Sequence, residues 1–428
     1  MPKLTIDSLG IEIPESDRSI LRALAERIAE AAALPENKEK KELWRRVNDL
    51  KQLRPVALVR RDEVPWHEMD VNEELQLRTS HAFSRSIEGL WRQSLYQWER
   101  MRCDMVVDPI LISPLWIDDT GFGLEIRETT IEQAEGNRIQ SHHYEPQIRD
   151  EKDVEKIQIP RVSLNRTLSE QFYQLRRALV GDILDVQRRG FRFVYVFLWD
   201  QLVEWWEPEQ ALMDLVMRPE LVHLAMQRLL EAWLARLDQY EDLNLLSHDE
   251  GNYDVGSGGL GFTGDLPADG FNPTQVRALD HWGFSTAQLF TGVSPQMHEE
   301  FALQYERRWM ERFGLTYYGC CDRLDNKIHL LESIPNLRKI SISPWADVER
   351  SAQQIGDRYV MSIKPNPAIL ATETWDVEAA RKDLESALEQ SKGCNVEIIM
   401  KDITTVRYEP HRLWEWASMA TELVESYG

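Results

Sequence analysis

RKISISPWADVERSAQQIGDRYVMSIKP (338–365) joins two short apolar segments through one helical pattern. The apolar segments at 338–343 and 358–365 are nearly continuous runs, which is typical of parallel strands that are buried on both faces. Residues 347–356 between them are predicted to form a helix. A strand, a helix and a second strand in this order form a βαβ unit, so this stretch predicts an α/β fold with a parallel sheet.

The same alternation extends from this stretch toward both ends of the chain. Further apolar segments that we predict to be strands are 54–59, 103–110, 191–199, 243–249, 314–320 and 396–402. Further predicted helices are 208–240, 295–313 and 376–392. Strands and helices in this number predict a closed TIM (β/α)8 barrel. Residues 283–290 are interpreted as an irregular return segment near the barrel mouth, and 111–190 as an insertion between strands 2 and 3 with a helix at 167–189.

Two amphipathic helices are predicted before the first strand. The stretches 16–34 and 37–53 carry apolar residues at helical spacing. We therefore predict a helical extension at 1–53 beside a barrel domain at 54–428. The apolar faces of this extension favour a homodimer.

The composition argues against several classes of protein. Lys and Arg total 50 against 72 Asp and Glu, and the net charge of −22 argues against binding to nucleic acid or to an anionic membrane. The apolar runs are much shorter than the ~20 residues that a membrane-spanning helix needs, and the N-terminus shows no secretion signal. Four cysteines are too few for a disulfide framework in 428 residues, so a cytoplasmic protein is expected.

Ionisable side chains follow the predicted strands, where the chemistry of such barrels is located. These strand-end residues are Asp108, Asp200, His248, Asp249, Glu250, Cys320, Cys321, Asp322, Asp347, Lys364, Asn366, Lys401 and Asp402. Tryptophans near the same ends, Trp199 among them, would wall an apolar or cationic ligand. The alternative is that strand ends meet solvent and are polar for that reason alone.

YYGCCD (317–322) is the sharpest local feature, because thiolates are good ligands for zinc. Successive strand residues face opposite ways, so only one of Cys320 and Cys321 is expected to face the mouth unless Gly319 turns the chain. The remaining ligands would come from His248, Glu250, Glu397 or Asp402. The alternative is that the two cysteines are small buried apolar residues.

The glycine-rich stretch VGSGGLGFTGD (255–265) contains the pattern GxGxxG. It follows a turn rather than a strand, and no clear helix follows it, so it does not indicate a dinucleotide site. We interpret it as a flexible lid or as a place where the backbone approaches a ligand.

Several motifs resemble the superfamily of uroporphyrinogen decarboxylase and cobalamin-independent methionine synthase. They are GFSTAQLFTGVSPQMHEEFALQYERRW (283–309), YYGCCD, PNLRKISISPWAD and KPNPAIL. The similarity spans residues 55–425 and looks closest to uroporphyrinogen-decarboxylase-like proteins labelled trimethylamine corrinoid protein 2. It implies a TIM barrel. The arginine-rich loop of the decarboxylases is replaced by VRRDEVPWHEM (59–69), and the His of the methyltransferases' His-x-Cys motif is missing.

The resemblance implies a methyltransferase that acts with a corrinoid protein on a small methylated amine or methoxy compound. A zinc ion would be held by Cys321 or Cys320 with His248 and Asp402, and the cobamide would belong to a separate partner. The residues expected to take part in catalysis are Asp402, Lys401 and Asp200. The residues expected to bind the substrate are Trp199, Lys364, Asn366, Tyr318 and Glu250.

Two other functions stay open at this point. The first is a metal-independent lyase that decarboxylates a small or cyclic carboxylate, held by Arg60, Arg61 or Lys364. The second is a non-catalytic ligand-binding barrel that serves regulation or assembly.

Overall fold

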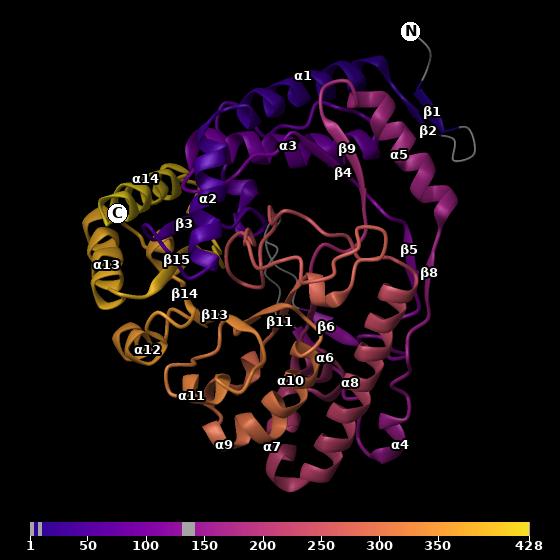
Figure 1. Cartoon of the computed structure of the whole chain (residues 1–428), viewed down its shortest axis with the longest axis vertical. Helices are drawn as coiled ribbons and strands as arrows, with labels where there is room; N and C mark the ends of the chain where they lie inside the picture. Colours follow the sequence, from indigo (N-terminus) through magenta and orange to yellow (C-terminus); the bar gives the residue numbers. More distant parts are fainter. Residues whose placement is uncertain (1–3, 7–10, 131–141, 428) are drawn as a thin grey trace.

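One parallel sheet organises the computed structural model of the chain, which describes residues 4–6, 11–130 and 142–427 (Figure 1). Its strands are β3 (Val56–Val59), β10 (Val194–Val196), β11 (Trp282–Ser285), β12 (Leu315–Tyr318), β13 (Leu337–Ile342), β14 (Val360–Ile363) and β15 (Asn395–Met400). They pair in the order β10-β11-β12-β13-β14-β15-β3, and all neighbours are parallel. The predicted α/β fold with a parallel sheet is confirmed.

The other described strands form two-stranded sheets. A parallel pair joins β4 (Ile110–Pro114) to β9 (Asp185–Arg189), and the chain passes from β9 directly toward β10. The antiparallel pairs are β1 (Leu4–Ile6) with β2 (Ile11–Ile13), β5 (Ile117–Asp119) with β8 (Val162–Leu164), and β6 (Glu128–Thr130) with β7 (His142–Tyr144). The pairs β5/β8 and β6/β7 fall within the predicted insertion.

Helices alternate with the strands of the sheet. They are α1 (Glu15–Ala32), α2 (Glu36–Asn48), α3 (Ala82–Arg100), α4 (Glu151–Val154), α5 (Arg166–Val180), α6 (Leu198–Trp206), α7 (Pro208–Met217), α8 (Pro219–Asp242), α9 (Pro295–His298), α10 (Gln304–Met310), α11 (Ile328–Leu331), α12 (Val348–Ile355), α13 (Val377–Gln390) and α14 (His411–Ser426). Leu384 of α13 and Leu413 of α14 share a buried cluster with Ile340 and Ile398 of the sheet. One face of the sheet is therefore covered by helices.

Four predicted segments are wrong. Of the expected strand at 103–110, only Ile110 lies in a strand, as the first residue of β4. The expected strand at 243–249 forms only one isolated bridge, between Leu246 and Phe191. The expected irregular segment at 283–290 instead provides β11, which pairs on both sides within the sheet. The expected helix at 167–189 ends early, and its last residues form β9. Short apolar runs do not distinguish a strand from a buried turn without knowledge of their partners.

The N-terminal helices α1 and α2 pack within the chain. Leu21, Leu24 and Ile28 of α1 are buried in one cluster with Trp91 of α3. The apolar face of α1 is thus covered internally and does not support the homodimer, which stays a prediction. The division of the chain at residue 53 also stays a prediction.

The face of the sheet opposite the covering helices carries polar residues at matching register. Ser341, Ser362 and Glu397 lie side by side on β13, β14 and β15. Glu397 Oε2 lies 2.7 Å from the ammonium nitrogen of Lys339, and both side chains are fully buried. Burial lowers the pKa of Lys339, while the carboxylate of Glu397 opposes that shift. This buried ion pair occupies the centre of the sheet.

The glycine-rich stretch packs against this inner face and is not a lid. A Cβ atom at Gly258 would lie 2.3 Å from Glu397 Oε1, and one at Gly259 would lie 2.2 Å from the Trp44 ring of α2. The backbone of this stretch approaches other groups closely, as expected of its glycines, but these groups are side chains of the protein and not a ligand.

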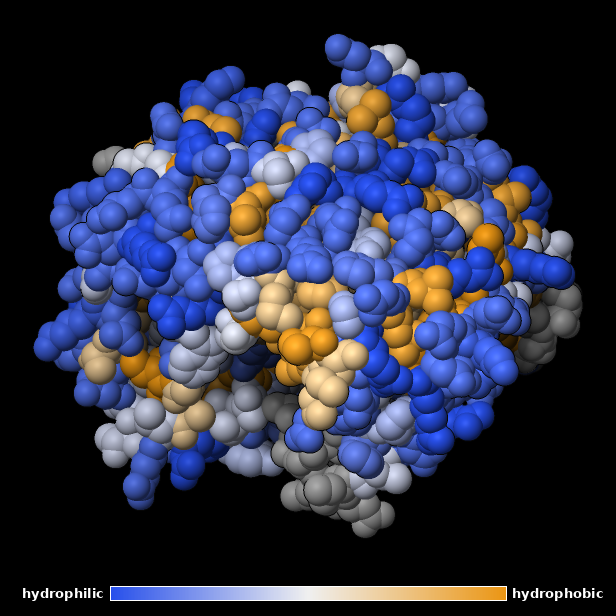
Figure 2. All heavy atoms as spheres, turned by 90° about the horizontal axis from the view of Figure 1, so that it is seen from below, coloured by the Kyte–Doolittle hydropathy of each residue, from blue (hydrophilic) through white to orange (hydrophobic). Residues whose placement is uncertain are grey.

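The surface is largely polar, with apolar side chains gathered at places on the face seen in Figure 2. On α7, which lies at the bottom of Figure 1, Met213, Val216 and Met217 are exposed. Among the helices that the structure describes, we find none that combines the length and apolar character needed to cross a membrane.

Candidate active site

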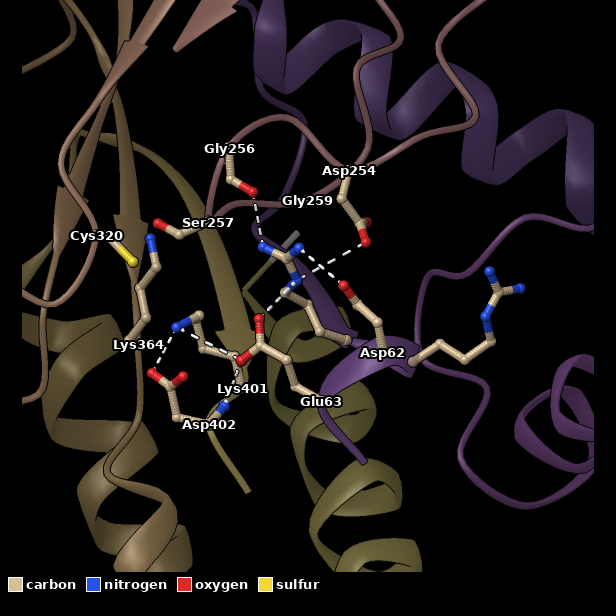
Figure 3. Close-up of polar contacts among 12 residues, drawn as sticks. Asp62, Glu63, Asp254, Gly256, Ser257, Gly259, Cys320, Lys364, Lys401 and Asp402 are labelled. Carbon is tan, nitrogen blue, oxygen red and sulfur yellow. Dashed lines mark hydrogen bonds and ion pairs between the residues drawn. The ribbon is translucent and has the colours of Figure 1, made fainter. Parts of the chain in front are cut away.

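Four parallel strands deliver ionisable side chains to one edge of the sheet. Arg60 follows β3, Cys320 follows β12 after one glycine, Lys364 follows β14 and Lys401 follows β15. Because the carboxyl ends of parallel strands meet at the same edge, these side chains converge. Figure 3 shows Cys320, Lys364 and Lys401 near one another with Glu63 and Asp402. We call these five residues, together with Cys321, the strand-end cluster.

Two adjacent thiols occupy the centre of the strand-end cluster. The Sγ atoms of Cys320 and Cys321 are 3.6 Å apart, and Cys321 Sγ lies 3.5 Å from Asp402 Oδ2. Gly319 has φ of +92°, and this left-handed turn brings both thiols to the same side. The sequence predicted that only one thiol would face the mouth unless the chain turned at Gly319. The structure has this turn.

The thiol of Cys320 is the more acidic of the two. A hydrogen bond from Cys321, together with the charges of Lys401 and Lys364, lowers the pKa of Cys320 to about 7. The pKa of Cys321 is raised by its contact with the Cys320 sulfur and by burial. Cys320 is therefore the thiol of the pair that ionises more readily.

Lys401 is held by carboxylates beside the thiols. Its Nζ lies 2.5 Å from Asp402 Oδ2, 3.5 Å from Glu63 Oε2 and 3.9 Å from Cys321 Sγ. Burial alone would lower the pKa of Lys401, but the negative charges at Cys320 and Glu63 raise it. Lys401 thus remains a cation that stabilises a thiolate.

Replacing Lys401 with Met is expected to make Cys320 less acidic, because a neighbouring positive charge is removed. The pKa of Cys320 should rise by about one unit or more. The pH dependence of its alkylation by iodoacetamide, read by peptide mass, measures this shift. Lys392→Met, which removes an exposed surface cation, is the matched control and should leave the profile unchanged. An unchanged midpoint in the Lys401 variant would contradict the assignment.

Lys364 presents an amine of a different kind. Its Nζ lies 2.5 Å from Tyr317 Oη and 2.7 Å from Ser362 Oγ, and the residue is 3% exposed. Burial lowers the pKa of Lys364 to about 7. In the described part of the chain we find no carboxylate within ion-pair distance of this amine. Lys364 can therefore give or accept a proton near neutral pH.

Arg60 joins the strand-end cluster to the glycine-rich stretch. Its Nη1 donates to the carbonyl of Gly256 at 2.7 Å, and its Nε lies 3.2 Å from Glu63 Oε1 and 3.8 Å from Asp254 Oδ2. Burial raises the pKa of Asp254. Arg60 is thus engaged by the protein itself. Arg61, the other arginine considered for substrate binding, donates to Ser94 on α3.

The strand-end cluster does not fit a zinc ion. Among the described residues no group of three or more His, Cys, Asp and Glu side chains is placed to hold a metal. The ammonium of Lys401 already forms an ion pair with the carboxylate of Asp402, and its charge would repel a metal cation beside Cys321. Glu397, another expected ligand, is paired with Lys339. We therefore derive no step through a metal.

His248 and Glu250 lie away from the thiols. His248 lines a cavity with Asp280, which comes just before β11, whereas Cys320 comes after the end of β12. Because β11 and β12 are parallel, the cavity lies at the amino ends of the strands and Cys320 lies at their carboxyl ends. Glu250 lines the same cavity and faces Lys41 at 3.8 Å. The strand expected at 243–249, which was to bring both residues to the mouth, is not formed.

Trp199 and Asn366 have structural contacts. Trp199 is fully buried and donates from its indole nitrogen to the carbonyl of Phe301 at 2.9 Å. The side chain of Asn366 accepts from the backbone of Ala368, at the start of a short helical turn.

Tyr318 and Asp200 belong to a second buried network, behind the strand-end cluster. Tyr318 donates to Glu306 Oε2 at 2.7 Å, and its hydroxyl lies 2.7 Å from His298 Nε2. Burial raises the pKa of Asp200, and Asp322 adds to that shift. Asp322 in turn accepts from the backbone of Cys320 at 2.9 Å. Through Asp322, this network holds the backbone of the loop that carries Cys320 and Cys321.

Glu306 is expected to weaken the folded state as the pH rises. Burial raises its pKa from 4.5 to about 7, so its stabilising contribution is complete below pH 4.5 and is lost as pH rises through 7. The loss is on the order of 3 kcal/mol. Glu306→Gln cannot ionise, so its unfolding free energy relative to wild type should increase between pH 5 and pH 8. Urea unfolding at both pH values tests this, and a constant difference would contradict it.

Several contributors to the site were not predicted as site residues. Tyr317, rather than Tyr318, points to the inner face and contacts Lys364 and Ser257. Glu63 joins Lys401 from the first strand loop. One available signal was the alternation of β12, in which Tyr317 and Tyr318 must face opposite ways.

Comparisons with known proteins find similar chains only among solved structures. No protein-family model matches the chain, and no curated protein matches it. Among solved structures, the chain is similar to a methyltransferase from Methanosarcina mazei, with 12% identity and a TM-score of 0.46. The match covers 91% of this chain and 98% of that chain. At this identity and score it assigns neither a family nor an activity.

Proposed function

We propose that the chain is a (β/α)8-barrel enzyme that transfers a methyl group, with the Cys320 thiolate as its nucleophile. The observation that carries the proposal is the acidic Cys320 thiol beside Lys401 and Lys364 at the carboxyl edge of the parallel strands. Thiolates are strong nucleophiles toward carbon, and such edges are where barrel enzymes place their chemistry. The substrate class proposed from the sequence resemblance is a small methylated amine or methoxy compound.

A closed barrel is part of this proposal. The strand β9 leads into β10 and pairs with β4 in a separate two-stranded sheet. In the proposed ring this pair lies between β10 and β3, the two outer strands of the seven-stranded sheet. The backbone N–H of Asp104, just before β4, donates to the carbonyl of Ala57 on β3 at 2.9 Å. This contact supports closure of the ring between β3 and β4.

In the proposed reaction the Cys320 sulfur forms a bond to the methyl carbon. The bond from that carbon to the donor nitrogen or oxygen breaks, and its electron pair stays on the leaving group. Lys364, with a pKa of about 7, donates a proton to that group, and Lys401 stabilises the thiolate before attack. A separate corrinoid protein is the proposed partner that exchanges the methyl group with Cys320.

The test uses the purified full chain and a panel of methylated amines and methoxy compounds. Peptide mass should show one methyl group on Cys320, and the visible spectrum of added reduced cobalamin should report methyl transfer. Metal analysis belongs to the same experiment, because stoichiometric zinc would contradict a metal-free thiolate. A wild-type chain that methylates neither Cys320 nor cobalamin with any donor would overturn the proposal.

A lyase is the second candidate, and Lys364 is the observation that favours it. The amine is free of carboxylate partners among the described residues, whereas Arg60 already lies 3.2 Å from Glu63 and donates to the carbonyl of Gly256. When protonated, the ammonium of Lys364 would hold the carboxylate of a substrate. Release of carbon dioxide from a carboxylate panel, lost in Lys364→Met but kept in Cys320→Ser, would favour the lyase over methyl transfer.

A further inference from the structure

We propose that Cys320 and Cys321 form a reversible disulfide by exchange with a small disulfide such as oxidised glutathione. The two Sγ atoms are already 3.6 Å apart, so the side chains hold the two sulfurs next to each other before any bond forms. This inference concerns a modification of the thiols and does not depend on which reaction the site performs.

The two thiols differ from the other cysteines of the chain in accessibility. Cys320 and Cys321 are partly exposed, whereas Cys103 and Cys394 are buried. Cys103 Sγ lies 3.5 Å from the carbonyl of Ala417, and Cys394 Sγ lies 3.7 Å from that of Ala352. A small disulfide in solution can therefore reach only the adjacent pair without unfolding of the chain.

The surroundings assign different roles to the two thiols. Lys401 and Lys364 place positive charge next to Cys320, which favours its thiolate and makes it the attacking group. Cys321 lies between Cys320 and Asp402, so it is positioned to react second. The hydroxyl of Ser341 donates to the carbonyl of Cys320, and the N–H of Cys320 donates to the carboxylate of Asp322, so both backbone groups of Cys320 are held.

The exchange proceeds in two balanced steps. The Cys320 thiolate attacks one sulfur of the small disulfide, whose S–S bond breaks and releases one small thiolate. Cys321 then loses its proton and attacks Cys320 Sγ in the mixed disulfide, which releases the second small thiolate. Two protein thiols are oxidised to one disulfide, and one small disulfide is reduced to two thiols.

The product should be easily reduced. Adjacent Cα atoms of a trans peptide are about 3.8 Å apart, below the range found in relaxed disulfides, so the ring is strained. Strained disulfides are the labile and regulatory ones. Oxidation would remove the nucleophile from the strand-end cluster, and mild reduction would restore it.

The test is incubation of the folded full chain with oxidised glutathione, followed by mass analysis of the peptide that contains both cysteines. Wild type should lose two hydrogen atoms without a glutathione adduct and recover them in dithiothreitol. Cys321→Ser should stop at the first step and keep glutathione on Cys320, and Cys320→Ser should form neither product. Cys394→Ser, which changes a buried thiol, is the control and should match wild type.

Other outcomes would overturn the proposal. They are a persistent glutathione adduct on the wild-type chain, a disulfide between two chains, and oxygen addition to Cys320 in place of a disulfide. Thermal unfolding followed by circular dichroism establishes that each variant is folded. Because no activity is measured, the result is independent of the methyl-transfer test, and a chain that transfers no methyl group is still expected to form the disulfide.

Discussion

The Cys320→Ser protein is expected to lose methyl transfer by on the order of a thousandfold or more, while it remains folded. A serine hydroxyl is not ionised near neutral pH, so the charges of Lys401 and Lys364 that favour the thiolate can no longer provide a nucleophile. Initial rates of cobalamin methylation with the best donor of the panel measure the loss.

The adjacent cysteine provides the matched control. Cys321→Ser retains the nucleophile and a hydroxyl that can donate to Cys320, so its rate should fall far less than that of Cys320→Ser. The midpoint of thermal unfolding should change little in both variants, since the substitution is nearly isosteric. Equal rates in the two variants would show that Cys320 is not the reacting group.

Replacing Lys339 with Met should destabilise the protein by about 3–5 kcal/mol, because a carboxylate is left buried without its main partner. Glu397 is fully buried 2.7 Å from the lysine nitrogen, and its other contacts are neutral groups, Ser362 Oγ and the N–H of Gly259. Urea unfolding at neutral pH measures the change in the free energy of unfolding.

A double variant separates the buried charge from the loss of packing. Lys339→Met combined with Glu397→Gln removes both charges and keeps an acceptor for Ser362, so most of the lost stability should return. Lys392→Met, at an exposed pair with Glu389, should change stability by less than about 0.5 kcal/mol. A Lys339→Met protein as stable as this control would show that Glu397 is not charged in the folded state.

The C-terminal half of the fold was predictable because its strands alternate regularly with helices. The runs 338–343, 358–365 and 396–402 coincide to within a residue or two with β13, β14 and β15, and each is apolar enough to be recognised alone. The earlier part was not predictable in the same way. Residues 243–249 are as apolar as a strand, but their partner Phe191 offers a single bridge, while β11 was hidden in a segment with mixed polarity.

Site residues were predicted correctly where the strand before them was predicted correctly. Cys320, Lys364 and Lys401 were found because they follow strands that were placed correctly, and parallel pairing then brought them together. His248 was misplaced together with its false strand. Lys339 and Glu397 were not assigned as a pair, since a charged residue inside an apolar strand finds its partner only through the register between strands.

The contacts of α2 decide how short a useful expression product can be. Trp44 donates from its indole nitrogen to the carbonyl of Asp104 at 2.7 Å and its ring lies against Gly259, while Asn48 donates to the carbonyls of Leu260 and Phe262. The Trp44 ring also covers the ammonium of the buried Lys339, 5.8 Å from the ring centroid, so a protein begun after this helix would admit water beside it. Truncations made for crystallisation should therefore retain α2 and also α1, whose Leu21, Leu24 and Ile28 are buried.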